Sequence, residues 1–89
     1  MNSGKDWALQ IDDSVYGFLK RIRRKDAERI LSVIRDLPED PFRGDIKKMK
    51  GEHNVWRRRI GVYRIRYELI AEEKIIHIFL VERRTSSSY

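Results

Sequence analysis

The stretch from Val55 to Tyr67, VWRRRIGVYRIRY, decides how the rest of the chain is interpreted. β-Branched and aromatic residues dominate it and Gly61 divides it in two, so it predicts two β-strands joined by a turn. Because successive side chains of a strand point to opposite faces, most of the apolar residues share one face and most of the arginines share the other. The expected basic face carries Arg57, Arg59, Arg64 and Arg66. Guanidinium groups arranged in rows suit a surface that binds phosphates.

The charge of the chain is concentrated around this hairpin. Residues 1–45 hold nine basic and nine acidic groups, whereas residues 46–89 hold eleven basic and five acidic groups, which accounts for the whole net charge of +6. An excess of positive charge confined to one half of a protein indicates a polyanionic partner, most simply a nucleic acid.

The length and composition predict one domain over residues 1–89 in a reducing compartment. Eighty-nine residues suit a single core, and the absence of cysteine excludes disulfides and thiolate metal sites. No apolar run approaches the roughly 18 residues of a membrane span. We therefore expect a cytoplasmic protein without a membrane partner.

Apolar spacing predicts the elements that precede the hairpin. Residues 7–11 alternate as in a strand, and a helical stripe begins with Val15 after possible N-caps at positions 12–14. A second helix follows a basic turn at residues 23–25, with Asp26 as its expected cap and Pro38 as its end.

The segment after Pro38 completes the predicted fold. Residues 46–51 form a short basic approach to the hairpin, and residues 75–81 are apolar except for His77, as in an interior strand. The predicted order is β-α-α-β-β-β. This is an α+β domain with a helical hairpin packed on one face of a four-stranded, largely antiparallel sheet, and the arginines lie on the other face.

The sequence offers little support for metal or nucleotide chemistry. Its two histidines, His53 and His77, have no carboxylate at ligand spacing, so neither a metal site nor a cofactor is expected. Glycine-rich nucleotide loops and a serine-hydrolase elbow are absent. What remains is phosphodiester chemistry, in which guanidinium groups stabilise the extra negative charge of the transition state. A tyrosine or lysine with a lowered pKa would move protons.

Three pieces of the sequence together resemble the RelE/ParE toxin superfamily, in its RelE-type mRNA interferase branch. They are IKKMKG at 46–51, VWRRRIGVYRIRY at 55–67, and an apolar strand that ends in Glu82-Arg83-Arg84 with Tyr89 nearby. The resemblance implies the RelE-like fold and the toxin of a type II toxin–antitoxin system. It further implies a ribosome-dependent endoribonuclease that cuts mRNA in the A site by attack of the 2′-OH, without a metal.

The resemblance also assigns roles to individual residues. Arg57 and Arg59 match two basic positions of the first hairpin strand, and Arg64 matches the arginine that supports the scissile phosphate. Arg84 matches an arginine at the end of the last strand, and Tyr89 matches a C-terminal tyrosine that orients or activates the nucleophile and stacks on a base. For RNA backbone binding we expect three lysines in addition: Lys47, Lys48 and Lys50.

Two positions depart from the family pattern. Arg57 and Arg59 stand where well-studied bacterial members have lysine, and arginine is a poor proton donor because its pKa exceeds about 12. Arg58 occupies a position that is usually apolar, so its stem must run along apolar surface or its end of the sheet must be exposed.

The resemblance implies a RelB-like antitoxin, ribosomal RNA and mRNA as partners, and a toxin–antitoxin hetero-oligomer. Two alternatives stay open. One is a ParE-type DNA gyrase inhibitor without nuclease activity, and the other is a catalytically weak, basic RNA-binding module.

Overall fold

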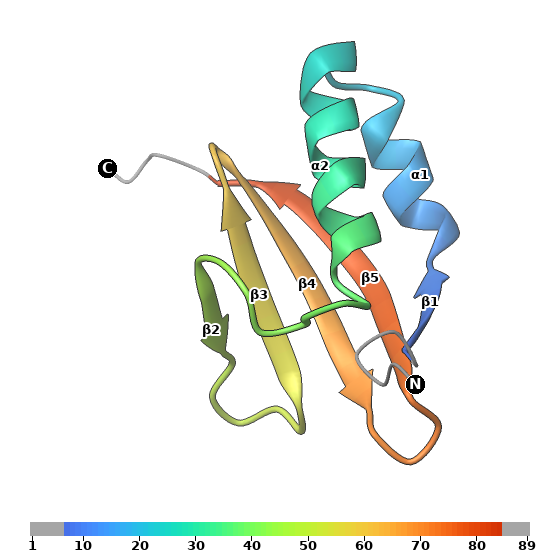
Figure 1. Ribbon diagram of the computed structural model, residues 1–89. Helices are drawn as coiled ribbons and strands as arrows, with labels where there is room; N and C mark the ends of the chain where they lie inside the picture. Colours follow the sequence, from blue (N-terminus) through green and yellow to red (C-terminus); the bar gives the residue numbers. More distant parts are fainter. Residues whose placement is uncertain (1–6, 85–89) are drawn as a thin grey trace.

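The computed structural model describes residues 7–84 and shows two helices on one face of a sheet (Figure 1). The elements are β1 (Ala8–Ile11), α1 (Asp13–Leu19), α2 (Arg24–Asp36), β2 (Ile46–Lys48), β3 (Val55–Ile60), β4 (Tyr63–Ile70) and β5 (Ile75–Arg83). The strand order across the sheet is β1-β5-β4-β3-β2. Only the β1–β5 pair is parallel, and the other pairs are antiparallel.

The predicted fold class is confirmed, but the sheet has five strands where the sequence predicted four. The additional strand is β2, which pairs with β3 through Ile46 opposite Arg58 and Lys47 opposite Arg57. A segment of three residues is too short to show the alternation by which a strand is recognised in a sequence. It forms a strand because it pairs with the edge of β3. The interior position predicted for residues 75–81 is also correct, because β5 lies between β1 and β4.

The first helix begins as predicted and the second does not. Asp12 is the N-cap of α1, whereas α2 begins at Arg24 with Arg23 as its N-cap, so Asp26 is not a cap. Asp26 lies in the first turn of α2, where a carboxylate is favoured by the helix dipole. Its Oδ2 accepts a hydrogen bond from the hydroxyl of Tyr63, 2.9 Å away. This contact with the sheet explains the acidic residue better than capping does.

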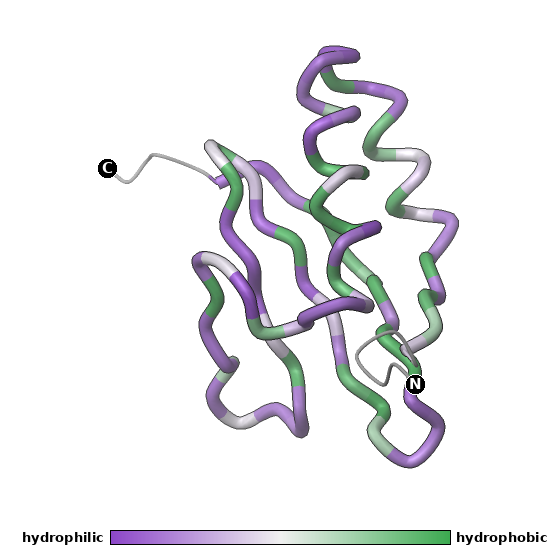
Figure 2. The backbone as a smooth tube through the Cα atoms, in the orientation of Figure 1, coloured by the Kyte–Doolittle hydropathy of each residue, from purple (hydrophilic) through white to green (hydrophobic). Residues whose placement is uncertain are grey.

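The core lies between the helices and the sheet. One face of β4 supplies Tyr63, Ile65, Tyr67 and Leu69, all at most 5% exposed. These side chains pack against Val15, Leu19, Ile30, Ile34, Leu37, Ile76, Ile78 and Val81. Figure 2 shows the corresponding pattern, since hydropathy alternates along both helices while β5 is hydrophobic over most of its length. Burial of this apolar surface is the main term that holds the helices on the sheet.

The connection between α2 and β2 covers the part of the sheet that the helices leave free (Figure 1). The Tyr67 hydroxyl donates a 2.6 Å hydrogen bond to the carbonyl of Pro41, and the ring of Phe42 packs edge-on against Trp56 with 5.2 Å between centroids. Helices and connection therefore lie on the same side. No element of residues 7–84 covers the opposite side, and no helix in this range is long and apolar enough to cross a membrane.

Candidate functional site

The uncovered face of the sheet carries the four arginines that the sequence placed there. In the β3–β4 register, Arg57 lies directly opposite Arg66 and Arg59 lies directly opposite Arg64. Their strand neighbours Ile65 and Tyr67 point to the core, so all four arginines belong to the uncovered side. We call these four residues the arginine face. Like charges directly opposite each other destabilise a strand pair, so the arrangement is costly in the absence of a counter-anion.

The side chain of Glu82 supplies part of that negative charge. Its Oε2 lies 3.2 Å from Nη2 of Arg66 and 4.0 Å from Nη1 of Arg64. All three side chains are between 25% and 34% exposed, so water screens them only partly. The buried Nε of Arg66 and Oε2 of Glu82 both lack a hydrogen-bond partner among the described residues. The carboxylate thus offsets part of the charge of the two guanidinium groups without a hydrogen bond to them, and donors remain for another anion.

The first strand of the hairpin is less well neutralised. Nε of Arg59 lies 3.7 Å from a carboxylate oxygen of Asp45, whose side chain is 70% exposed. An ion pair this exposed contributes little. Arg57 has no carboxylate partner in the described part of the chain. These two guanidinium groups are the ones most available to an incoming anion.

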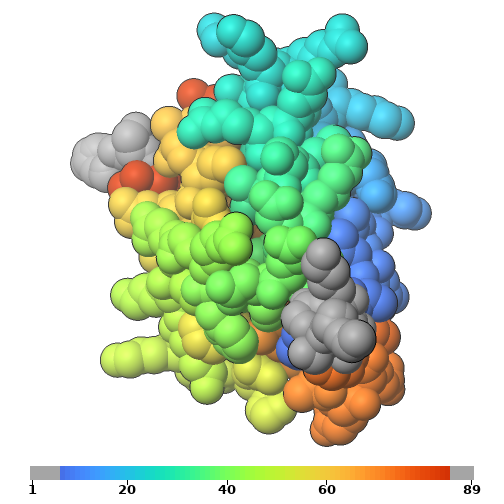
Figure 3. Space-filling model, in the orientation of Figure 1, coloured from blue at the N-terminus to red at the C-terminus, as the bar shows by residue number. Residues whose placement is uncertain are grey.

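The lysines predicted to bind RNA lie beside the arginine face. An open hollow of about 280 Å³ is lined by Lys47, Lys48, Met49, Lys50 and Arg57. Lys47 shares the face of Arg57 because the two residues are opposite each other in the β2–β3 pair. Figure 3 shows long side chains from this yellow-green part of the chain projecting past the edge of the sheet. The structure therefore brings the predicted lysines and Arg57 together.

Two other predicted site residues lie at or beyond the end of β5. The backbone N–H of Arg84 donates a hydrogen bond to the carbonyl of Val62, and the residue is exposed. Arg84 is thereby attached to the turn between β3 and β4, at Val62, which is two residues before Arg64 in the chain. Tyr89 lies outside the described residues.

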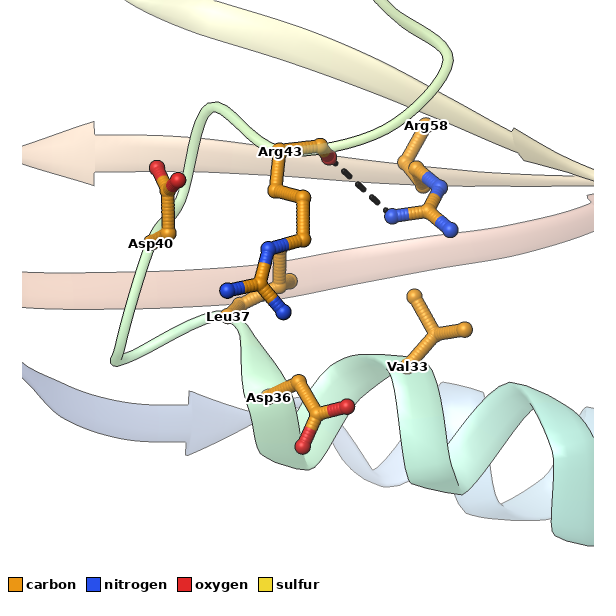
Figure 4. Close-up of a pocket in the computed structure, with 6 residues that line it drawn as sticks. All are labelled: Val33, Asp36, Leu37, Asp40, Arg43 and Arg58. Carbon is orange, nitrogen blue, oxygen red and sulfur yellow. Dashed lines mark hydrogen bonds between the residues drawn. The ribbon is translucent and has the colours of Figure 1, made fainter.

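Arg58 is directed to the side of the sheet that the helices cover, and its hydrogen bonds explain why an arginine is accommodated there. It pairs with Ile46 and Ile65, and its guanidinium donates to the carbonyl oxygens of Arg43 at 3.1 Å and Arg59 at 3.3 Å. Figure 4 shows the guanidinium in a small cavity of about 70 Å³ between α2 and the α2–β2 connection. Arg58 therefore anchors that connection and is not part of the arginine face.

Two further acidic groups of the uncovered face surround His77. Nδ1 of His77 lies 3.1 Å from Glu68, and its Nε2 lies 3.5 Å from Asp12. The ring thus ties β5 to β4 and to the start of α1, which goes beyond the passive sheet position expected for it. His53 is exposed in the turn before β3.

The arginine face also carries two acidic residues, of which the sequence predicts one. Alternation along β4 predicts that Glu68 lies on the face of Arg64 and Arg66, and the structure places it there. Glu82 was not predicted as a neighbour of the site residues, because an irregularity between Arg66 and Tyr67 shifts the β4–β5 register. Residues beyond such a bulge change their partners.

Comparison with known proteins identifies the family. Residues 6–87 match the family model described as the ParE toxin of type II toxin–antitoxin systems, parDE. The chain belongs to this toxin family. The RelE/ParE resemblance is thereby confirmed, and the curated relative "Putative toxin RelE1" of Methanocaldococcus jannaschii is 30% identical over 79 residues, which is 85% of this chain and 88% of that protein.

Solved members of the family have the same fold. The archaeal RelE–RelB complex of Pyrococcus horikoshii superposes with a TM-score of 0.79 at 23% identity, covering 91% of this chain and 98% of that one. The RelB–RelE antitoxin–toxin complex of Methanococcus jannaschii gives 0.70 at 27% identity, covering 83% and 88%. The isolated E. coli RelE toxin gives 0.77 at 17% identity, covering 92% and 88%. The two-helix, mixed-sheet architecture is thus the toxin fold of this family.

Proposed function

We propose that this toxin is a ribosome-dependent endoribonuclease that cleaves mRNA in the A site. The observation that carries the proposal is the arginine face itself, in which Arg57 opposes Arg66 and Arg59 opposes Arg64. A sheet tolerates two adjacent pairs of opposed cations at a cost, and a bound phosphodiester backbone would remove that cost.

In the proposed reaction a ribose 2′-oxygen forms a bond to the adjacent phosphorus and the bond from phosphorus to the 5′-oxygen breaks, which leaves a 2′,3′-cyclic phosphate. The 2′-OH loses its proton to Tyr89, and the departing 5′-oxygen takes a proton from solvent water. Arg64 and Arg84 would stabilise the additional negative charge on the phosphate in the transition state, where fixed guanidinium groups contribute most. Arg57 and Arg59 would hold the phosphate, and Lys47, Lys48 and Lys50 would bind the backbone of mRNA or ribosomal RNA. Arg64 suits its role because its side chain is only 25% exposed and its Nη1 keeps a distance of 4.0 Å from the Glu82 carboxylate, which leaves its donors to a phosphate.

Proton transfer is assigned to Tyr89 in this proposal. Arginine does not exchange protons near neutral pH, so the arginine face can bind and stabilise charge but cannot act as acid or base. A tyrosine close to several guanidinium groups has a stabilised phenolate and can accept the proton of the 2′-OH. No metal or cofactor is assigned a role.

The proposed protein partner is a RelB-like antitoxin. The P. horikoshii and M. jannaschii structures contain RelE with RelB, and the M. jannaschii RelE is 27% identical to this chain. The net charge of +6 favours an acidic partner segment. Such a segment would neutralise the arginine face and block access of RNA to it.

The test is primer extension on translating ribosomes with the wild-type protein and the Arg64→Ala variant. Removing one charge-stabilising group is expected to lower cleavage by about 10²-fold or more. Arg35→Ala, an exposed arginine of α2, is the matched control and should cleave as the wild type does. Equal cleavage by the Arg64→Ala variant and the wild type would contradict the site assignment.

A second candidate is inhibition of DNA gyrase, because the matching family model is described as ParE. The proposal of a nuclease predicts no effect in a supercoiling assay with purified gyrase. Inhibition of gyrase without cleavage of mRNA would contradict the nuclease proposal and support the gyrase inhibitor. Salt-dependent RNA binding without either activity would indicate a catalytically weak RNA-binding module.

A further inference from the structure

A second basic site lies at one end of the molecule, away from the arginine face. It is an open hollow of about 450 Å³ between the α1–α2 turn, the β3–β4 turn and the end of β5, at the top of Figure 1. The residues that line it are Arg21, Ile22, Arg23, Asp26, Val62, Tyr63 and Arg83. Three separate parts of the chain thus line one concave surface: residues 21–26, residues 62–63 and Arg83.

The hollow carries a positive charge that the rest of the described chain leaves uncompensated. In residues 7–84, none of its three guanidinium groups has a carboxylate at ion-pair distance. The one acid present, Asp26, accepts the hydrogen bond of the Tyr63 hydroxyl at 2.9 Å. Three arginines and one aspartate leave a formal charge of +2 on the lining. The free donors therefore belong to Arg21, Arg23 and Arg83.

Two of these arginines converge on the same phenol. The guanidinium of Arg83 lies over the ring of Tyr63, with 5.8 Å between its central carbon and the ring centroid. Burial and the bond to Asp26 raise the pKa of Tyr63, and the charges of Arg83 and Arg23 act in the opposite direction. Arg23 and Arg83 thus both act on the Tyr63 hydroxyl, and both line the same hollow.

A fourth cation extends the site along the β3–β4 turn. A Cβ at Gly61, which has a φ of +59°, would lie 3.5 Å from Nη2 of Arg29 on α2. The guanidinium of Arg29 therefore lies against the turn whose next residue, Val62, lines the hollow. Arg29 thus adds a cation beside the turn that forms one wall of the hollow.

We propose that this hollow binds a phosphate group of an RNA backbone, as a site distinct from the arginine face. Arginine forks match phosphate oxygens in a bidentate manner. The Tyr63 ring is covered by Arg83, so it offers no free surface for base stacking and the site recognises phosphate, not a base. The choice of RNA as the source of that phosphate rests on the proposed function, whereas the anion site itself does not.

The path of the chain connects the two basic surfaces. Tyr63 and Arg83 face the helices, and their neighbours Arg64 and Glu82 face the other way. Arg84 is exposed at the same strand end and is attached to Val62. An RNA strand that crosses the arginine face and passes the β3–β4 turn would therefore meet Arg84 and then the hollow.

The first test uses inorganic phosphate and the arginine Nε–Hε signals of the ¹⁵N-labelled protein. Phosphate is expected to shift the signals of Arg21, Arg23 and Arg83 with one common Kd, and Arg23→Gln should weaken that Kd several-fold. The signal of Arg35 is the internal control. If all arginine signals instead move in parallel and without saturation, phosphate is an adventitious ion only and the proposal is overturned.

The second test separates RNA from free phosphate by measuring the affinity of a short single-stranded RNA with 2′-O-methyl groups as a function of salt. Loss of one phosphate contact should reduce the slope of log K against log salt by about 0.7. The variant is Arg21→Gln/Arg23→Gln, and the control with the same loss of charge is Lys25→Gln/Arg35→Gln, at exposed positions outside the hollow.

The outcomes of the second test are distinct. A lower slope in the first variant alone supports the proposal. An equal reduction of the slope in both variants would mean that only net charge matters. An unchanged slope in both variants would mean that RNA does not reach the hollow. Either result overturns the proposal. Failure of the proposed nuclease function would appear separately, as absent cleavage by a wild-type protein that still shows the difference between the two variants.

Discussion

The Oε2 atom of Glu82 lies 3.2 Å from Nη2 of Arg66, on a face where two pairs of arginines stand opposite each other. Both side chains are about one-quarter to one-third exposed. This ion pair lowers the repulsion within the arginine face and also places a negative charge beside the guanidinium groups that a phosphate would use. Glu82 therefore sets a compromise between stability of the sheet and affinity for an anion.

Replacing Glu82 with glutamine should separate the two effects. We expect Glu82→Gln to lower the free energy of unfolding by about 1 kcal/mol at low salt, between the values for exposed and buried pairs, and to raise RNA affinity several-fold. Urea unfolding and RNA binding at two salt concentrations are the measurements. Glu72→Gln, in the exposed β4–β5 turn, is the control. Lower RNA affinity in Glu82→Gln would contradict this account.

Two glycines provide a matched pair for backbone strain. Gly44 has a φ of +93°, a conformation that is strained for any residue with a Cβ, and a Cβ there would also displace the guanidinium of Arg58, so Gly44→Ala should cost about 1–3 kcal/mol. Gly17 lies within α1 with open space around its Cα, so Gly17→Ala should stabilise the protein by about 0.5–1 kcal/mol. Thermal unfolding measures both. Opposite signs are expected, and a neutral Gly44→Ala would show that the connection does not need a positive φ at residue 44.

The buried hydroxyl of Tyr67 should make the protein sensitive to alkali. Burial raises the pKa of Tyr67 to about 12. The unfolded chain, with a tyrosine pKa near 10, loses this proton first, so the contribution is complete below about pH 10 and falls as the pH rises toward 12, by roughly 2–3 kcal/mol. Urea unfolding between pH 8 and pH 12 tests this.

The control for the alkaline effect is Tyr67→Phe. This variant loses the hydrogen bond to the carbonyl of Pro41, so its stability should be lower by about 1–2 kcal/mol at pH 8. Its stability should then change less with pH than that of the wild type. A parallel decline in both proteins would assign the alkaline sensitivity to other groups.

If proton transfer limits the proposed cleavage, a lysine at position 59, where the family pattern has lysine, should raise the cleavage rate. We expect Arg59→Lys to raise the single-turnover rate on ribosome-bound mRNA by about 10-fold or more, because a general acid contributes about 10²–10⁴-fold. Its pH–rate profile should gain an ionisation that the wild type lacks. Arg35→Lys is the control. An unchanged rate and profile would show that charge stabilisation, not proton transfer, limits the reaction.

Most of the fold could be predicted from local patterns. The α-helical stripe after residue 15, the alternation in residues 55–67 and the apolar run at 75–81 identify the helices and the main strands, because each pattern follows from the period of one element. Patterns of this kind do not show pairing between strands. For that reason β2, which has three residues, was not predicted as a strand. The start of α2 was predicted incorrectly because Asp26, a typical N-cap residue, instead accepts a hydrogen bond from Tyr63 on the sheet.

For the candidate site, the sequence by itself determined which residues are cationic and that Arg57, Arg59, Arg64 and Arg66 share one face, since a period of two depends only on the backbone of a strand. Tertiary structure alone decided which groups meet across elements. It placed Glu82 between Arg64 and Arg66, Arg58 under the α2–β2 connection, and Arg21, Arg23 and Arg83 around one hollow. These contacts depend on strand register and on the packing of helices against the sheet, which are set by long-range burial and not by neighbours in the sequence.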